Sequence, residues 1–175
     1  DNHAKVVEID PQTHQLLFCG TVRQGLCTVY STKNIGDLGS MQELSASNMV
    51  NYAGGRDSVY AFFGRSSITG SEVSTLYVGH SHDGRPLDLA PKAVSARTLK
   101  INHQGQFNMT YLYESPPHNI YTAIDIDSVH KSTYRVRYIH GFQHQGFTYF
   151  LTVQRDELDL NSNYVTKLVR VCQND

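Results

Sequence analysis

The chain has 175 residues, of which 39% are hydrophobic and 18% charged, and its formal net charge is -1. This length predicts one domain or part of one. A near-neutral charge without a cluster of Lys and Arg argues against nucleic acid or an anionic membrane surface as partner. The longest apolar runs are far shorter than a membrane span, so we expect no direct membrane insertion by this segment.

Short strands recur along the chain in three groups. They are predicted at 5–10, 16–21 and 26–31, then at 59–64, 75–81 and 93–99, and finally at 134–142, 148–154 and 164–171. Most are rich in β-branched and aromatic residues and are bounded by Gly, Ser or Asn. The segment 35–49 is long enough for a short helix, but Gly36 and Gly39 favour a loop there.

The three groups form a loose repeat that starts at residues 5, 59 and 134. Groups of short antiparallel strands at this spacing are typical of the blades of a β-propeller. Propellers usually close with four to eight blades, so we expect the folded unit to extend beyond this chain. A self-contained β-sandwich is the alternative that the strand pattern leaves open.

Two cysteines lie in the first predicted hairpin, which runs from Leu16 to Tyr30 around a Gly-containing turn. Cys19 and Cys27 are thereby placed on facing strands, at a separation from which a disulfide can form. A disulfide would indicate an oxidising compartment, whereas two buried thiols are the alternative. Cys172 is then left without a partner, and the simpler interpretation is a partner cysteine downstream rather than a buried free thiol.

Two further features concern export. The triplet that begins at Asn108 matches the glycosylation sequon, and it indicates the same compartment as the cysteine hairpin. The polar start of the chain is not a signal peptide, so we expect any export signal to have been removed or to lie elsewhere.

The search for catalytic residues finds little. The sequence has no Gly-x-Ser-x-Gly motif, P-loop or His-Glu-x-x-His motif. Histidine pairs at His80 and His140 have no Cys or carboxylate at the spacing of a zinc site. Asp125 and Asp127 are predicted on one strand face, a pattern more typical of a solvent-facing strand than of an acid–base pair. We therefore predict no enzyme activity, no metal and no cofactor.

Four segments closely resemble the plexin version of the sema domain: the opening 1–6, the cysteine hairpin 19–27, and the stretches 147–154 and 167–175. The resemblance covers the whole chain in order. It implies an all-β fold, namely part of a seven-bladed β-propeller with antiparallel four-stranded blades. Residues 1–175 would supply roughly blades 2 to 4 of one sema domain, with no complete domain boundary inside the chain. It also implies that Cys19 and Cys27 are paired and that Cys172 pairs beyond residue 175.

The resemblance implies the extracellular ligand-binding segment of a plexin-type, single-pass cell-surface receptor. Its implied partner is a semaphorin, in axon guidance and cell-migration signalling, with receptor self-association as a second implied contact. The nearest competitor is a hepatocyte-growth-factor-receptor-like kinase, which shares the cysteine pattern. A propeller hydrolase or sialidase and a purely structural propeller module are the alternatives from other classes.

The family's binding edge matches the segment 127–135. The implied contact residues are His130, Lys131, Tyr134, Arg135 and Arg137. Tyr134 aligns with an aromatic contact of related receptors, but its alternation with Val136 and Tyr138 places it equally well in the core between blades. The two arginines face the other way, where they would meet either an acidic patch of the ligand or solvent.

Overall fold

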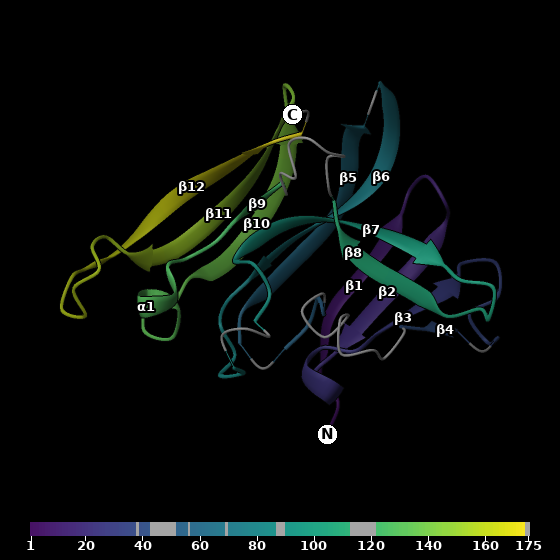
Figure 1. The fold of residues 1–175 in the computed structure, drawn as a ribbon, viewed down its shortest axis with the longest axis horizontal. Coiled ribbons are helices and arrows are strands. Elements are labelled where there is room, and N and C mark those ends of the chain that lie inside the picture. The colour runs from purple at the N-terminus through teal and green to yellow at the C-terminus, as the bar shows by residue number, and fades with distance from the viewer. Residues whose placement is uncertain are drawn as a thin grey trace.

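The computed structural model describes residues 1–37, 39–42, 52–55, 57–68, 70–86, 90–112 and 122–173. These residues form three antiparallel sheets that follow one another along the chain (Figure 1). The all-β prediction is confirmed. Each group of predicted strands corresponds to one sheet. The agreement follows because runs of apolar and β-branched residues between turn residues favour strands locally.

The first sheet has the strand order β1-β2-β3-β4. Its strands are β1 (Ala4–Asp10), β2 (Gln15–Gly20), β3 (Cys27–Ser31) and β4 (Ser40–Met41). A short 3-10 turn, η1 (Val22–Gln24), joins β2 to β3. Strand β4 lies in the segment predicted to be a loop, and it is held by its pairing with β3.

The second sheet has the order β5-β6-β7-β8, and a fifth strand, β9, also pairs with β7. Its strands are β5 (Val59–Ile68), β6 (Ser71–His80), β7 (Val94–Ile101), β8 (Phe107–Tyr111) and β9 (Ala123–Ile124). The strand prediction missed β8 and β9. Both are short and depend on pairing with β7.

The third sheet consists of β10 (Arg137–His144), β11 (Phe147–Arg155) and β12 (Tyr164–Cys172), in that order. A one-turn helix, α1 (Ser128–Lys131), precedes it. The prediction that a strand begins at residue 134 is wrong by three residues. The backbone N–H of Tyr134 donates to the carbonyl of His130 at 2.7 Å, which closes the turn after α1 instead of extending β10.

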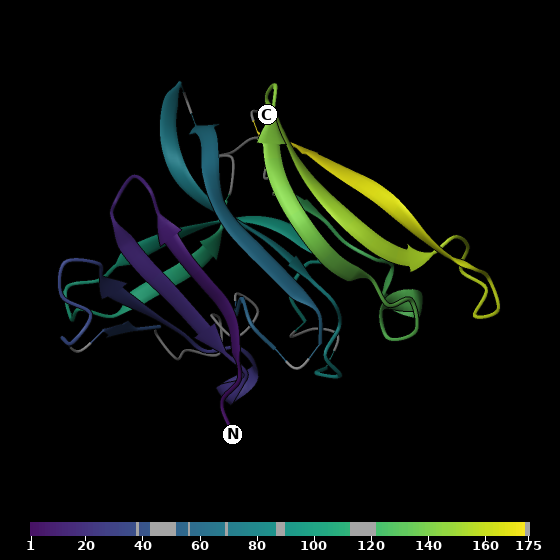
Figure 2. The same ribbon diagram turned by 180° about the vertical axis from the view of Figure 1, so that it is seen from behind.

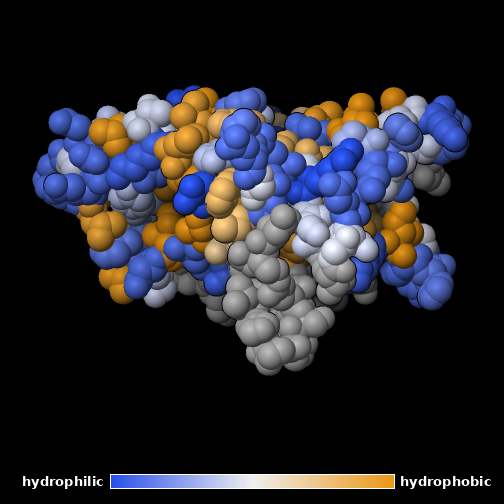
Figure 3. All heavy atoms as spheres, turned by 90° about the horizontal axis from the view of Figure 1, so that it is seen from above, coloured by the Kyte–Doolittle hydropathy of each residue, from blue (hydrophilic) through white to orange (hydrophobic). Residues whose placement is uncertain are grey.

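The three sheets pack face to face through two hydrophobic layers. Leu17 of the first sheet and Leu76 of the second lie in one layer, while Tyr77 of the second sheet and Phe150 of the third lie in the other. The first strands of the sheets are neighbours, with β5 between β1 and β10 (Figure 2). Antiparallel sheets stacked in this order are typical of a β-propeller. Seen from above, hydrophilic and hydrophobic residues are interspersed on the surface (Figure 3).

Polar contacts also join the second and third sheets. The side-chain amide of Gln143 donates to the carbonyl of Arg65 at 2.9 Å and accepts from its N–H at 2.9 Å. The hydroxyl of Ser58 accepts a hydrogen bond from the N–H of Tyr138 at 3.0 Å. These directional bonds fix how the two sheets are placed against each other, which apolar packing alone does not.

The predicted disulfide is present. Cys19 and Cys27 are directly opposite in the β2–β3 pairing, both are buried, and their sulfur atoms are bonded at 2.07 Å. Cys172, at the end of β12, has a free thiol and is half-buried. A partner for it beyond residue 175 stays a prediction.

Removing this disulfide is expected to lower the free energy of unfolding by about 2–3 kcal/mol, because it closes a short loop and so constrains the unfolded chain. The test is urea denaturation of the Cys19→Ala/Cys27→Ala variant beside Cys172→Ala as the control. Equal unfolding midpoints for the double variant and the control would contradict the prediction.

Candidate ligand-binding edge

The predicted binding edge is formed by α1 and the turn that leads into β10. Asp127 begins the helix: its Oδ1 accepts from the N–H of Val129 at 2.9 Å, an N-cap contact that satisfies one of the helix's free donors. Val129 is 77% exposed, and His130 is half-buried beside it. The prediction that residues 125–127 lie on a strand is wrong, since β9 ends at Ile124 and the chain turns into α1.

Lys131 is buried, and its ammonium group is already engaged. Its Nζ lies 2.9 Å from Oδ1 of Asp125, whose Oδ2 is 3.1 Å from Nζ of Lys92. Burial alone would raise the pKa of Asp125, but the hydrogen bonds from Lys131 and Lys92 outweigh it and hold that pKa below its usual range. Asp125 thus fastens α1 to the second sheet. A ligand contact by Lys131 stays a prediction.

The sequence left two roles open for Tyr134, a ligand contact and a core residue, and the structure gives it features of both. It is half-buried and packs against the hydrophobic layer between the second and third sheets. Its hydroxyl donates to the carbonyl of Arg155 at 2.5 Å and accepts from Nε2 of Gln154 at 3.1 Å. The ring is therefore held in one position, with part of its surface still open to a ligand.

The two arginines of the edge are exposed, as the alternation predicted, while Val136 and Tyr138 are buried. The side chain of Arg135 is 71% exposed, and its Nη1 lies 3.5 Å from Oδ1 of Asp57. Arg137 forms no ion pair with any residue that the structure describes.

Both arginines line a groove of about 650 Å³ at one end of the sheets, where β1, β5 and β10 begin. We call this the inner-end groove; its wall includes Lys5, Asp57, Arg135, Arg137, Val153 and Tyr164. The sequence prediction missed Lys5, Asp57 and Tyr164. They lie far apart in the chain, and only the packing of the sheets brings them to the arginines.

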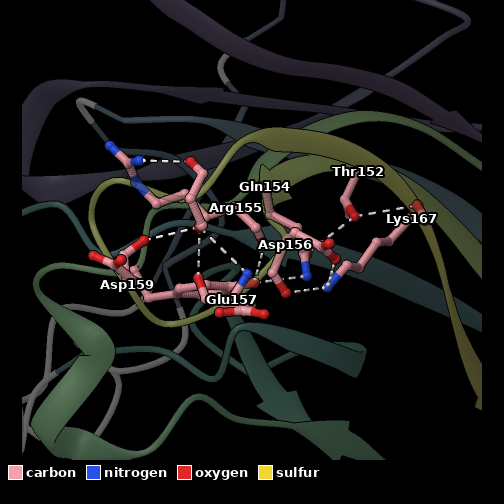
Figure 4. Close-up of polar contacts among 9 residues, drawn as sticks. Thr152, Gln154, Arg155, Asp156, Glu157, Asp159 and Lys167 are labelled. Carbon is pink, nitrogen blue, oxygen red and sulfur yellow. Dashed lines mark hydrogen bonds and ion pairs between the residues drawn. The ribbon is translucent and has the colours of Figure 1, made fainter.

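The far wall of the groove is held by the hairpin between β11 and β12 (Figure 4). Nη1 of Arg155 donates to the carbonyl of Ser162 at 3.0 Å, and Nζ of Lys167 donates to the carbonyl of Asp156 at 2.9 Å. The guanidinium of Arg155 lies 4.9 Å from the ring centre of Tyr164. These contacts order the end of the hairpin and position the Tyr164 ring.

A separate polar cluster is buried and does not reach the edge. Nη2 of Arg85 lies 2.5 Å from Oδ2 of Asp83 and donates to the carbonyl of Gln24 at 2.7 Å. Burial, with the charge of Arg85 nearby, lowers the pKa of His80 to about 3. The cluster ties the loop after β6 to the turn at η1, so its role is structural.

The remaining predicted residues stand as follows. Asn108 lies half-buried in β8, and its Oδ1 is buried without a hydrogen-bond partner among the described residues, so its glycosylation stays a prediction. Within the described ranges, no three His, Cys, Asp or Glu side chains gather as a metal site requires. Nor does any helix there have the length and apolar character to cross a membrane.

No protein-family model matches the chain. It is 28% identical to Plexin-A3 of Rattus norvegicus over 182 residues, 28% to Plexin-A2 of Mus musculus over 183 residues and 25% to Plexin-A4 of Homo sapiens over 190 residues. Each alignment covers 100% of the chain and 9% of the relative.

Among solved structures, the Plexin A4 full extracellular region matches 99% of the chain with a TM-score of 0.69 and 24% identity. The chain covers 19% of that structure. Over its whole length the chain is therefore similar to the plexin sema domain in sequence and in fold. Drosophila Semaphorin 2a matches 99% of the chain with a TM-score of 0.54 and 16% identity, and the chain covers 26% of that structure. This likeness shows a shared fold alone.

The chain spans about 9% of the length of these curated relatives.

Proposed function

We propose that this plexin-type segment forms part of the ligand-recognition surface of an extracellular receptor domain, with a semaphorin as the ligand. The observation that carries the proposal is the whole-length similarity to plexins, whose extracellular region has the same fold over 99% of this chain. The proposed location is the extracellular face of the plasma membrane, and the proposed role is in guidance and migration signalling.

The chemistry of the edge supports protein recognition. Aromatic and Arg side chains dominate the binding energy of protein interfaces, while charges at the rim set specificity and association rate. The edge offers a fixed, half-buried Tyr134 beside the exposed Arg135 and Arg137. Recognition by such a surface requires no bond to be made or broken, so the proposed role is not catalytic.

We further propose that the three sheets are three consecutive blades, roughly the second to the fourth, of one propeller. The outer face of the third sheet supports this. Ile139 and Phe142 of β10 are each 41% exposed, and Leu168 of β12 is 54% exposed. Apolar side chains exposed in this way are typical of a face that another protein surface covers.

The test is surface-plasmon binding of a panel of semaphorin ectodomains to the receptor ectodomain that contains this chain. Tyr134→Ala, and separately Arg135→Glu/Arg137→Glu, are expected to weaken binding tenfold or more, about 1.4 kcal/mol. Lys100→Glu is the matched control, because Lys100 is an exposed cation of β7 outside the edge.

Three results are informative. Binding that only the edge variants weaken, with thermal unfolding unchanged, supports the proposal. Binding that no variant changes would support the proposed receptor function and contradict the proposed location of the binding site at this edge. Absence of binding to every semaphorin would reject the proposed ligand.

A further inference from the structure

We propose that the inner-end groove binds an acidic polypeptide segment, and that Asp57 competes with this segment for Arg135. The inference deepens the proposed function, since it names the chemistry of the ligand segment and adds a residue that limits its affinity.

The charges of the groove favour an anionic ligand. Lys5 of β1, Arg137 of β10 and Arg135 of the turn before β10 contribute three cations, against the single carboxylate of Asp57. A concave site lined by one sign of charge concentrates ligands of the opposite sign. An arginine guanidinium can also hold a carboxylate through two parallel hydrogen bonds, so each arginine has a geometric match to Asp or Glu.

The contact between Arg135 and Asp57 is one that a ligand can replace. The two groups are 3.5 Å apart, and their side chains are 71% and 30% exposed. Ion pairs with this exposure contribute little stability, because water solvates both partners well. A ligand carboxylate would take the place of Asp57 at Arg135, at the cost of separating that pair.

The groove also has an apolar wall, which favours a polypeptide over a sulfated glycan. Val153 is half-buried, and Tyr164 is 61% exposed with one ring face under Arg155. Apolar side chains of a peptide would pack against this wall, whereas the sugar of a densely sulfated glycan offers few such groups. The carboxylate of Asp57 would in addition repel a continuous row of sulfates.

The floor of the groove is held in place before any ligand arrives. The hydroxyl of Ser81 donates to the carbonyl of Val136, and the N–H of Ser81 donates to the carbonyl of Ser58 at 2.9 Å. Ser58 in turn accepts from the N–H of Tyr138. A site fixed in this way loses little conformational entropy on binding.

The experiment measures fluorescence anisotropy of a labelled acidic hexapeptide of alternating glutamate and leucine, titrated with the ectodomain that contains this chain. Arg135→Gln/Arg137→Gln is expected to weaken binding about tenfold and to flatten its salt dependence. Asp57→Asn is expected to tighten binding about threefold, since the side chain keeps its size and loses the competing charge.

Matched controls separate these effects from a change in net charge. Lys100→Gln and Asp37→Asn remove one exposed charge each outside the groove and should leave the affinity unchanged. A gain in affinity for Asp57→Asn but not for Asp37→Asn supports the inference. Unchanged or weaker binding by Asp57→Asn would overturn the competition, and equal losses for the arginine variant and Lys100→Gln would overturn the site.

Two further outcomes distinguish this inference from the proposed function. If a sulfated heparin hexasaccharide binds in an Arg135-dependent way and the acidic peptide does not, the peptide class is wrong. If the peptide binds as expected and no semaphorin binds the ectodomain, the groove is a site for acidic peptides and the proposal of a semaphorin ligand is wrong.

Discussion

The variant Gly25→Ala is expected to lower the free energy of unfolding by about 3 kcal/mol or more. Two causes add. Gly25 has φ 108° and ψ 35°, a left-handed conformation that an L side chain rarely adopts. A Cβ at this position would also overlap the carbonyl of Gly54, where two backbone segments touch. Because the obstacle is main chain, it cannot turn aside as a side chain would.

The control for this prediction lies in the same chain. Gly105 has φ 75° and nothing within 4 Å of an added Cβ, so Gly105→Ala carries the conformational cost without the overlap. We expect it to cost about 1 kcal/mol. Urea denaturation followed by circular dichroism measures both. Equal losses for the two variants would show that the contact between Gly25 and Gly54 contributes nothing.

Acidification is expected to destabilise the protein between pH 7 and pH 4.5 by about 2–3 kcal/mol through His80 alone. In the folded chain the pKa of His80 is lowered to about 3, chiefly by burial and then by Arg85. In the unfolded chain it returns to about 6.5. Between these values only the unfolded state binds the proton, so stability is fully present above about pH 6.5 and falls as pH decreases toward 3.

The measurement is the free energy of unfolding at a series of pH values for the wild type and for His80→Gln. The variant is expected to lose most of the slope in this range, whatever its stability at pH 7. His103→Gln, which changes an exposed histidine, should keep the slope. A His80→Gln profile parallel to that of the wild type would show that other groups cause the pH dependence. Asp83 and the two nearby arginines are the charges that face His80.

The main strands could be predicted because their signals are local. Alternation and β-branched runs identified all nine strands of the three groups to within a few residues, and the Cys19–Cys27 pairing followed from facing positions in one hairpin. Among the strands that were missed, β4 and β9 have two residues each, whereas β8 has five. The two-residue strands are too short for a pattern of their own and form through their pairing with β3 and β7.

The edge was predicted in part. The alternation of apolar and charged residues correctly predicted that Arg135 and Arg137 are exposed and that Val136 and Tyr138 are buried. It failed at α1, where one side-chain contact from Asp127 is enough to begin a helical turn too short for a periodic pattern. The burial of Lys131 was not foreseeable either, because Asp125 and the sheet beneath it are positioned by tertiary packing.

The double contact of Gln143 with the backbone of Arg65 has a mechanical consequence. A pull on the third sheet reaches the second through this amide and through Ser58. Where such a pull acts along the strands, the bonds are loaded together in shear rather than opened one after another. We expect the two sheets to move as one body under force, so that a pull on one sheet is transmitted to the other.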